Sequence, residues 1–383
     1  MRTEGDTFLN EGLLRKGMSI PSDQLEAFRE ALDRAARPLF FFDGDADGLT
    51  AFTLLYKYKK EGRGVMISGR PQLNEDFLRK YEAYQPDVVF ILDTAQVTQE
   101  FIDGVRCPIY WLDHHEPQQG SLQLPKRVHY LNPRLENPDD GRPTAFWAYQ
   151  IARQEENIWI AMVGIIGDYF FDEFLAERLR ERFPEYLSRK ITHQGEALFD
   201  SPLGTLIRVM NFNLKGAVSD SMTSVKIFTR IEHPDEILHQ ESPRGRYLWK
   251  RYLRVMKHYE RLFAEAEQQI DAKDPFIVFV YQNEVFSLSS ELANELKYRH
   301  KEKVVVVGRR HEGKVMMSLR SEVVPILPSL QKALGEVEGY GGGHPRACGA
   351  VVAEKDFDRF IKLFREAFSS FERTFRIEEK EEP

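Results

Sequence analysis

Short apolar runs alternate with helical patterns between residues 38 and 112. The predicted strands are residues 38–42, 65–68, 87–92 and 108–112, and the predicted helices between them include residues 49–60 and 75–84. Strands that are unbroken apolar runs separated by helices are typical of a parallel sheet that is covered on both faces. We therefore expect an α/β fold with a parallel, doubly wound N-terminal domain.

The pattern changes after residue 144 and is almost wholly helical to residue 270. In its last part an apolar seam has spacings of three and four residues, formed by Leu248, Tyr252, Val255, Tyr259 and Leu262. Basic residues follow the same rhythm on another face: Lys250, Arg254, Lys257 and Arg261. The seam favours an internal contact over self-association. The basic face is interpreted as a solvated helix surface, with a phosphate-binding surface as the alternative.

A second and smaller α/β segment begins near Phe276. Its predicted strands are residues 276–281, 304–308, 315–319 and 347–352, and a helix closes the chain. We expect three parts: a domain at 1–170 with an N-terminal lead, a helical middle and connecting helix at 171–272, and an α/β domain at 273–383.

Composition narrows the class of protein. The chain has 383 residues, a net charge of −7 and 42% hydrophobic residues, so any nucleic-acid surface must be a local patch on an acidic body. It has 2 cysteines, Cys107 and Cys348, which excludes a disulfide framework and a four-cysteine zinc site. The absence of a signal-peptide pattern and of a run of about 18 apolar residues predicts a cytoplasmic protein that does not cross a membrane.

Acidic residues gather where the predicted elements end. Asp45 and Asp47 follow the first strand, Asp93 follows the third, Asp113-His114-His115 follow the fourth, and Asp168 follows an apolar helical run. A lone aspartate at such a place is often a helix cap, and Asp-Gly-Asp-Ala-Asp-Gly resembles a calcium loop without its closing glutamate. Placement at one sheet edge favours a metal site instead, with Mn²⁺, Mg²⁺ or Zn²⁺ as suitable ions.

These motifs together resemble those of DHH-family phosphoesterases with a C-terminal DHHA1 domain, the group that includes RecJ exonucleases and oligoribonucleases. The resemblance is carried by residues 43–48, Asp93, residues 113–115, Asp168, the step at residues 131–134, Ser318-Leu319-Arg320-Ser321 and Gly341-Gly342-Gly343-His344. It covers residues 38–170 and 275–370 and implies an archaeal-type RecJ-like exonuclease.

The resemblance also implies roles for individual residues. Asp93 would bridge two Mn²⁺ or Mg²⁺ ions, Asp47, His114 and Asp168 would complete one site, and Asp45 would serve the other. His115 would contact the scissile phosphate, and Asp113 would orient a neighbouring histidine. The family usually has a histidine four residues before the first metal-binding aspartate, where this chain has Phe41. The ion served by Asp45 is therefore expected to bind weakly unless Asp43 or water substitutes.

The glycine-rich segment of the second domain has two interpretations. Three consecutive glycines form either a flexible turn or a backbone that can approach an anion closely. The resemblance favours the second and implies a substrate-binding set of Arg320, Ser321, Gly341, Gly342, Gly343 and His344, to which Arg346 could contribute.

Three functions remain open at this point. The first is a single-strand-specific exonuclease acting on DNA or RNA in repair or replication, with a helicase or replication factor as a possible partner. The second is a phosphodiesterase for very short oligonucleotides, cyclic dinucleotides or nucleoside bisphosphates. The third is a replication or repair scaffold with a weakened centre, which Phe41 alone favours.

Overall fold

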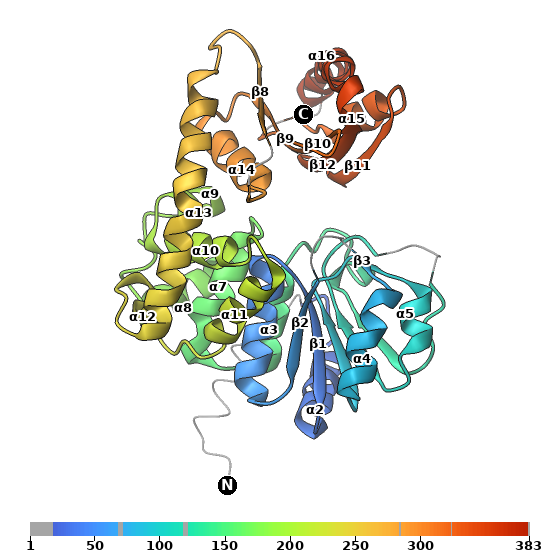
Figure 1. Cartoon of the computed structure of the whole chain (residues 1–383), viewed down its shortest axis with the longest axis vertical. Coiled ribbons are helices and arrows are strands. Elements are labelled where there is room, and N and C mark those ends of the chain that lie inside the picture. The colour runs from blue at the N-terminus through green and yellow to red at the C-terminus, as the bar shows by residue number, and fades with distance from the viewer. Residues whose placement is uncertain (1–17, 68–71, 118–121, 283–284, 323, 382–383) are drawn as a thin grey trace. The chain divides into compact units, whose positions relative to one another are not determined.

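The chain forms two compact units, Met1–Tyr252 and Leu253–Pro383. The computed structural model describes residues 18–67, 72–117, 122–282, 285–322 and 324–381, with side chains as far as residue 372 (Figure 1). None of the helices in these ranges combines the length and the apolar character that crossing a bilayer requires. The expected division at residues 170 and 272 stays a prediction, and residues 171–252 pack within the first unit.

A parallel sheet of five strands organises the first unit. Its order is β2-β1-β4-β6-β7, and every neighbouring pair is parallel. The strands are β1 (Pro38–Asp43), β2 (Arg63–Ile67), β4 (Val88–Leu92), β6 (Ile109–Leu112) and β7 (Val128–Leu131), and a small separate pair is formed by β3 (Gln72–Leu73) and β5 (Gln96–Val97). The expected parallel sheet is confirmed.

Helices cover both faces of this sheet because strand side chains alternate in direction. On one face lie α2 (Ser22–Arg34) and α3 (Ala46–Lys59), where Phe52 of α3 stacks on Phe42 with ring centroids 4.6 Å apart. On the other lie the 3₁₀ turn Glu75–Phe77, α4 (Leu78–Tyr84) and α5 (Gln99–Gly104), where Phe41 meets Phe101. The sheet is therefore doubly wound (Figure 1).

Strand β7 was not expected from the sequence. Only Leu131 of its four residues is buried and His129 is exposed, because the strand lies at the edge of the sheet, where β6 is its one described strand neighbour. An edge strand with one solvent-exposed face lacks the unbroken apolar run that is typical of the central strands.

Helices fill residues 144–268, as expected from the pattern. They are α6 (Thr144–Ala152), α7 (Ile158–Gly167), α8 (Glu173–Arg182), α9 (Gln194–Phe199), α10 (Pro202–Asn213), α11 (Val218–Phe228), α12 (Asp235–Leu238) and α13 (Pro243–Gln268), with short 3₁₀ turns at Pro133–Leu135 and Glu155–Asn157. All five residues of the apolar seam on α13 are buried, so the seam is an internal contact. The four basic residues of the neighbouring face are exposed.

The second unit holds a sheet of order β11-β12-β10-β9-β8. Its strands are β8 (Phe276–Gln282), β9 (Val304–His311), β10 (Lys314–Arg320), β11 (Gly339–His344) and β12 (Ala347–Ala353), and its helices are α14 (Ser289–Arg299), α15 (Leu327–Leu334) and α16 (Phe357–Glu381), the last preceded by a 3₁₀ turn at Glu354–Asp356. Only β8 and β9 are parallel. The glycine-rich segment is an edge strand, not a turn.

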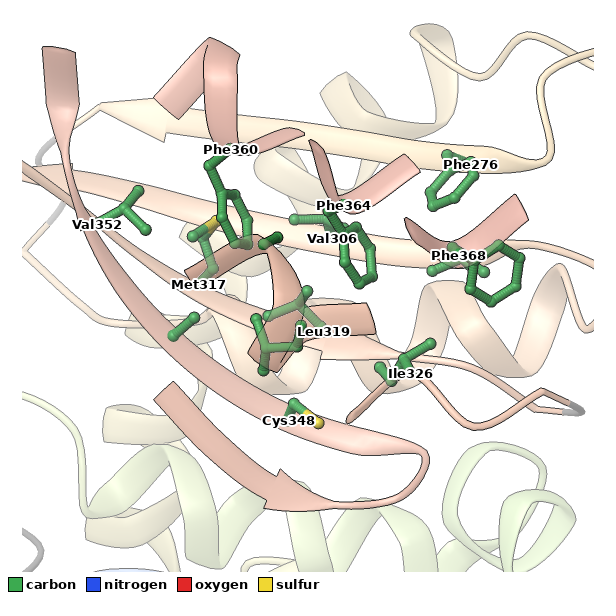
Figure 2. Close-up of a cluster of buried hydrophobic side chains, with 14 of the residues drawn as sticks. Phe276, Val306, Met317, Leu319, Ile326, Cys348, Val352, Phe360, Phe364 and Phe368 are labelled. Atoms are coloured by element: carbon green, nitrogen blue, oxygen red, sulfur yellow. The ribbon is translucent and has the colours of Figure 1, made fainter. Parts of the chain in front are cut away.

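Aromatic side chains from α16 build the core of this unit. Phe360, Phe364 and Phe368 lie on one face of the helix and pack over the sheet, with Leu319 beneath them (Figure 2). Cys348 belongs to the same cluster, where burial raises the pKa of its thiol to about 11. The thiol is therefore a packed core group and not a nucleophile.

Candidate metal centre

The acidic residues meet at the carboxyl ends of β1, β4 and β6. The chain runs from β1 to β2 on one side and then places β4 on the other side of β1, so the direction of winding reverses between β1 and β4. Asp43 ends β1, Asp93 follows β4 and Asp113 follows β6. Ligand sites in open parallel sheets form at this kind of reversal, since the loops diverge and leave room between them.

The imidazole of His114 lies among three carboxylates. Its Nε2 atom is 3.5 Å from Oδ1 of Asp93, 3.5 Å from Oδ2 of Asp168 and 3.8 Å from Oδ2 of Asp47. His114 is buried, and its Nδ1 atom has no hydrogen-bond partner among the described residues. Three residues, Asp47, His114 and Asp168, each offer a ligand atom within 4.8 Å of the others. At this spacing one metal ion could bind to all three atoms.

Helix α6 anchors the carboxylate of Asp47. The backbone N–H groups of Thr144 and Ala145 donate to its two oxygens over 2.8 Å and 2.7 Å, and the Thr144 hydroxyl donates to Asp93 over 3.3 Å. The first N–H groups of a helix have no partner within the helix and are suited to hold an anion. These contacts were not predicted from the sequence, although its pattern indicates a helix that begins at Thr144.

A second group consists of Asp43, Asp45 and Asp93, whose ligand atoms also lie within 4.8 Å of one another. Asp45 caps α3 by accepting from the N–H of Gly48 over 3.0 Å. Phe41 takes no part, since it is fully buried between Phe77 and Phe101. Asp43 therefore supplies a carboxylate to the group that lacks the expected histidine.

Asp93 belongs to both regions of the centre. It is grouped with Asp43 and Asp45 and also with His114 and His115. Its backbone has a φ of 53°, which is uncommon for a residue other than glycine. Tyr169, directly after Asp168, has a φ of 61°. Left-handed residues of this kind gather at functional sites, where the surrounding structure holds the backbone in place.

A hydrogen-bond network holds His115 beside the centre. Its Nδ1 atom is 2.8 Å from Oδ1 of the fully buried Asp113, and about a third of the His115 side chain is exposed (34%). The side-chain amide of Asn132 donates to the carbonyl of His115 over 2.9 Å and to the Tyr130 hydroxyl over 2.8 Å. Arg134 donates to the carbonyl of His114 over 2.8 Å. The Asn-Pro-Arg step thus fixes the backbone of the histidine pair.

Burial, followed by mutual repulsion, raises the pKa of most carboxyls in the centre. The pKa values of Asp45 and Asp47 are raised well above the usual range, first by desolvation and then by the charge of Asp93. The same causes raise the pKa of Asp43 to about 6, and desolvation raises that of Asp168. Desolvation also opposes ionisation of Asp93, but the hydrogen bonds from His114 and Asp45 and the charges of His114 and His115 together outweigh it and lower the pKa of Asp93 to about 2.

The donor set fits a divalent cation. Carboxylates crowded at this spacing ionise together only when a positive charge lies between them. His114 adds an imidazole ligand atom and Asp43 adds an oxygen where Phe41 gives none. Oxygen and imidazole donors suit Mn²⁺ and Mg²⁺, so the residues present fit the metal that the sequence predicts.

The expected substrate-binding residues lie in the second unit. Arg320 of β10 and His344 of β11 both pair with Ala347 of the strand between them. The guanidinium of Arg320 donates to Oδ1 of Asn294 over 2.7 Å and to the hydroxyl of Ser290 over 2.9 Å. It also donates to the carbonyls of Leu319 and Cys348. These bonds fix the orientation of Arg320 and occupy most of its five N–H groups.

The other members of that set differ in exposure. Ser321 is buried and its N–H donates to the carbonyl of Arg346 over 3.0 Å, whereas His344 is exposed. Gly341 and Gly342 have ordinary strand geometry, and only Gly343 has a positive φ, of 135°. A Cβ atom at Gly343 would lie 2.5 Å from the carbonyl oxygen of Ala347, so the strand end requires glycine.

Comparison with known proteins gives a family match for the second unit and a fold match for most of the chain. Residues 274–370 match the DHHA1 domain model. RecJ from Thermus thermophilus in complex with Mn²⁺ superimposes with a TM-score of 0.64 and 18% identity, covering 93% of this chain and 55% of that one. The same RecJ is also known in complex with Mg²⁺. The chain therefore spans about half the length of this RecJ.

Two further structures are similar over nearly their whole length. An exonuclease RecJ bound to manganese has a TM-score of 0.57 and 17% identity, with 93% of this chain and 95% of that one covered. The DHH domain of a member of the s1p family of ribosomal proteins has a TM-score of 0.63 and 14% identity, with 95% and 96% covered. No curated protein matches the sequence. The DHHA1 match confirms the resemblance predicted for the second unit, and the solved structures confirm the predicted fold.

Proposed function

We propose that this chain is a metal-dependent phosphodiesterase that acts as an exonuclease on single-stranded DNA or RNA. One observation carries the proposal: Asp45, Asp47, Asp93, His114 and Asp168 converge on the carboxyl edge of a RecJ-like sheet, although they come from four separate segments of the chain. A replication or repair scaffold would have no need of this donor set. The bound Mn²⁺ and Mg²⁺ of RecJ support the same choice of ions here.

The residues of the first unit have distinct tasks in this proposal. Asp47, His114 and Asp168 would hold one ion, Asp43 and Asp45 would hold the other, and Asp93 would contribute to both. When bound, the ions supply a nucleophilic hydroxide near neutral pH and stabilise charge on the phosphoryl oxygens. His115 reaches the phosphate from the exposed side of the centre, and Asp113 fixes the direction of its ring.

The second unit binds the remainder of the substrate in this proposal. Arg320 is held in one orientation by Asn294 and Ser290, which prepares its free N–H for a phosphate oxygen. His344 lies in register with it across β12 and is exposed. Contacts of this kind recognise phosphate and not the base, so the features described do not select a nucleotide sequence. Single-stranded nucleic acid is the substrate class that this arrangement and the RecJ fold favour.

The cellular process, the location and the partner that we propose follow from the resemblance to RecJ-like proteins. We place the enzyme in DNA repair or replication in the cytoplasm, with a helicase or replication factor as an interacting protein. Self-association is not part of the proposal, because the apolar seam of α13 is already buried.

Digestion of end-labelled strands tests the proposal. Long single strands of DNA and RNA, labelled at either end, are incubated with the protein in Mn²⁺, Mg²⁺ or EDTA. We expect metal-dependent shortening from one end, with the first label released giving the polarity. Asp93→Asn is the matched control, because asparagine tolerates the left-handed backbone and removes only the charge.

Two other results would replace the exonuclease proposal. Hydrolysis of dinucleotides, cyclic dinucleotides or nucleoside bisphosphates without digestion of long strands would establish the small-substrate phosphodiesterase. Failure on every substrate, together with no bound manganese in the purified protein dialysed against Mn²⁺, would establish a scaffold.

A further inference from the structure

A pocket separate from the metal centre lies in the first unit, at the outer edge of the sheet. It has a volume of about 580 Å³ and is bounded by strand β2, helix α3, the segment Phe77–Lys80 and helix α11. In Figure 1, β2 is the strand beside α3. The pocket shares no lining residue with the candidate metal centre, so the phosphodiesterase chemistry does not account for it.

The inner wall of this pocket is apolar. Phe52, Met66 and Val225 are buried side chains that line it, and Met222 and Val218 extend the apolar surface toward the solvent. Val218 is 52% exposed, so it continues the apolar wall to the molecular surface. Gly64 leaves room for the ring of Phe52, since a Cβ there would lie 2.5 Å from the Phe52 Cζ atom. The wall is therefore built by close packing of side chains from three elements.

Positive charge surrounds the opening. Arg63, Lys80, Lys226 and Arg230 line the pocket and are exposed, and its lining contains no carboxylate. In the described ranges none of the four forms an ion pair, although the Arg63 guanidinium lies 5.9 Å from the centre of the Tyr84 ring. These four side chains form a local cluster of positive charge in a chain whose net charge is −7. They select an anionic ligand.

The backbone of β2 adds a third recognition element. β2 is an edge strand whose one strand neighbour in the described chain is β1. Residues 62–66 line the pocket, so a ligand bound there would lie beside this strand edge. An extended peptide can pair with such an edge, while its side chains enter the neighbouring pocket.

We propose that this pocket is a docking site for an extended acidic segment of a partner protein, anchored by a bulky apolar side chain. Carboxylates of the segment would meet the four cations, and the anchor would fill the wall around Phe52 and Met222. A nucleic-acid base fits less well, because the polar side chains of the lining are the four cations and the hydroxyls of Tyr56 and Thr229, which leave few side-chain acceptors for the amino groups of a base. A donor of a buried base that finds no acceptor would weaken the binding of that base.

A random twelve-residue peptide library displayed on phage tests this site with the full chain as the target. We expect selected peptides to combine Asp or Glu with Leu, Ile, Met or Phe. Binding of the synthesised peptides, measured by fluorescence anisotropy, should weaken at least tenfold in the double variant Lys226→Glu/Arg230→Glu. It should weaken to a similar degree in Met222→Trp, which fills the pocket without changing charge.

The control is the double variant Lys126→Glu/Lys190→Glu, which makes the same charge change at exposed positions outside the pocket. It should retain peptide affinity, and circular dichroism establishes that every variant is folded. The proposal is wrong if the selected peptides bind all variants equally, or if no peptide is enriched. It is also wrong if Lys226→Glu/Arg230→Glu loses affinity for a (dT)12 oligonucleotide in EDTA but not for peptides. These readouts do not depend on hydrolysis.

Discussion

The carboxylate of Asp47 accepts a hydrogen bond over 2.7 Å from the backbone N–H of Ala145, which lies 98 residues later in the chain. A second bond from Thr144 occupies the other carboxylate oxygen. The first turn of α3 is thereby tied to the first turn of α6. A metal ligand fixed at both oxygens by backbone groups keeps its position when neighbouring side chains move.

The first prediction concerns this residue. Asp47→Ala should reduce metal-dependent hydrolysis below about one hundredth of the wild-type rate, because losing even an outer partner of a metal ligand costs about 10- to 100-fold. Bound manganese, measured by mass spectrometry of dialysed protein, should fall as well. Full activity of Asp47→Ala at saturating Mn²⁺ would contradict the assignment.

The second prediction separates the two groups of ligands. Asp43→Asn removes a charge from the group that contains Asp45, and leaves Asp47, His114 and Asp168 in place. Calorimetric titration with Mn²⁺ should show one tight ion retained and the other weakened at least tenfold. Asp103→Asn, at an exposed carboxylate on α5, serves as the control. An unchanged titration of Asp43→Asn would mean that Asp43 is no ligand.

Asn132 should act as a positioning residue for His115. Asn132→Ala removes the bonds to the His115 carbonyl and the Tyr130 hydroxyl, so kcat should fall roughly 10- to 100-fold. KM and manganese affinity should stay within about twofold, since no proposed ligand or phosphate contact is deleted. Tyr130→Phe keeps the bond to His115 and should have a smaller effect. Equal losses in both variants would assign the role to Tyr130 instead.

Arg320→Ala should raise KM for a single strand by roughly tenfold or more, because a hydrogen bond from a charged group contributes about 1.5–3 kcal/mol. Manganese binding should not change. Ser290→Ala removes one of the bonds that orient the guanidinium and should raise KM less. An unaltered KM for folded Arg320→Ala would restrict Arg320 to the structural bonds that it makes within the second unit.

The core of the second unit gives a prediction about stability. Phe364→Ala empties a fully buried position beside Phe276 and Phe360, and should lower the free energy of unfolding of that unit by about 3–5 kcal/mol. Phe364→Leu should cost less because it leaves a smaller cavity. Urea denaturation followed by circular dichroism measures both. An equal loss of unfolding free energy in the two variants would mean that the size of the cavity does not determine the destabilisation.

The sequence predicted those parts of the fold whose pattern is local. Residues 38–42 and 88–92 are unbroken apolar runs, and the acidic residues directly after them could be assigned to one edge once the sheet was taken as parallel. Strand β7 was missed because its edge position gives it no such run. The strand Gly339–His344 was missed because its pairing with β12 overrides the preference of glycine for turns.

In the metal centre, too, contacts between distant segments could not be predicted from the sequence. The bonds from Thr144 and Ala145 to Asp47 use backbone N–H groups, which every residue type except proline carries, so no side-chain pattern marks them. The pocket beside β2 draws residues from positions 52 to 230, and no single segment of that span contains its charge pattern. Such features arise only when distant elements pack together.

Phe41 and Asp43 point to the same face of β1, because side chains two residues apart on a strand share a side. The group formed by Asp43, Asp45 and Asp93 consequently offers oxygen donors alone, whereas the group around His114 includes a nitrogen. Hard ions accept an all-oxygen environment, and softer ions gain more from imidazole. The two positions should therefore discriminate differently between metals: zinc should compete at the His114 position first, and magnesium should be retained longest beside Asp43.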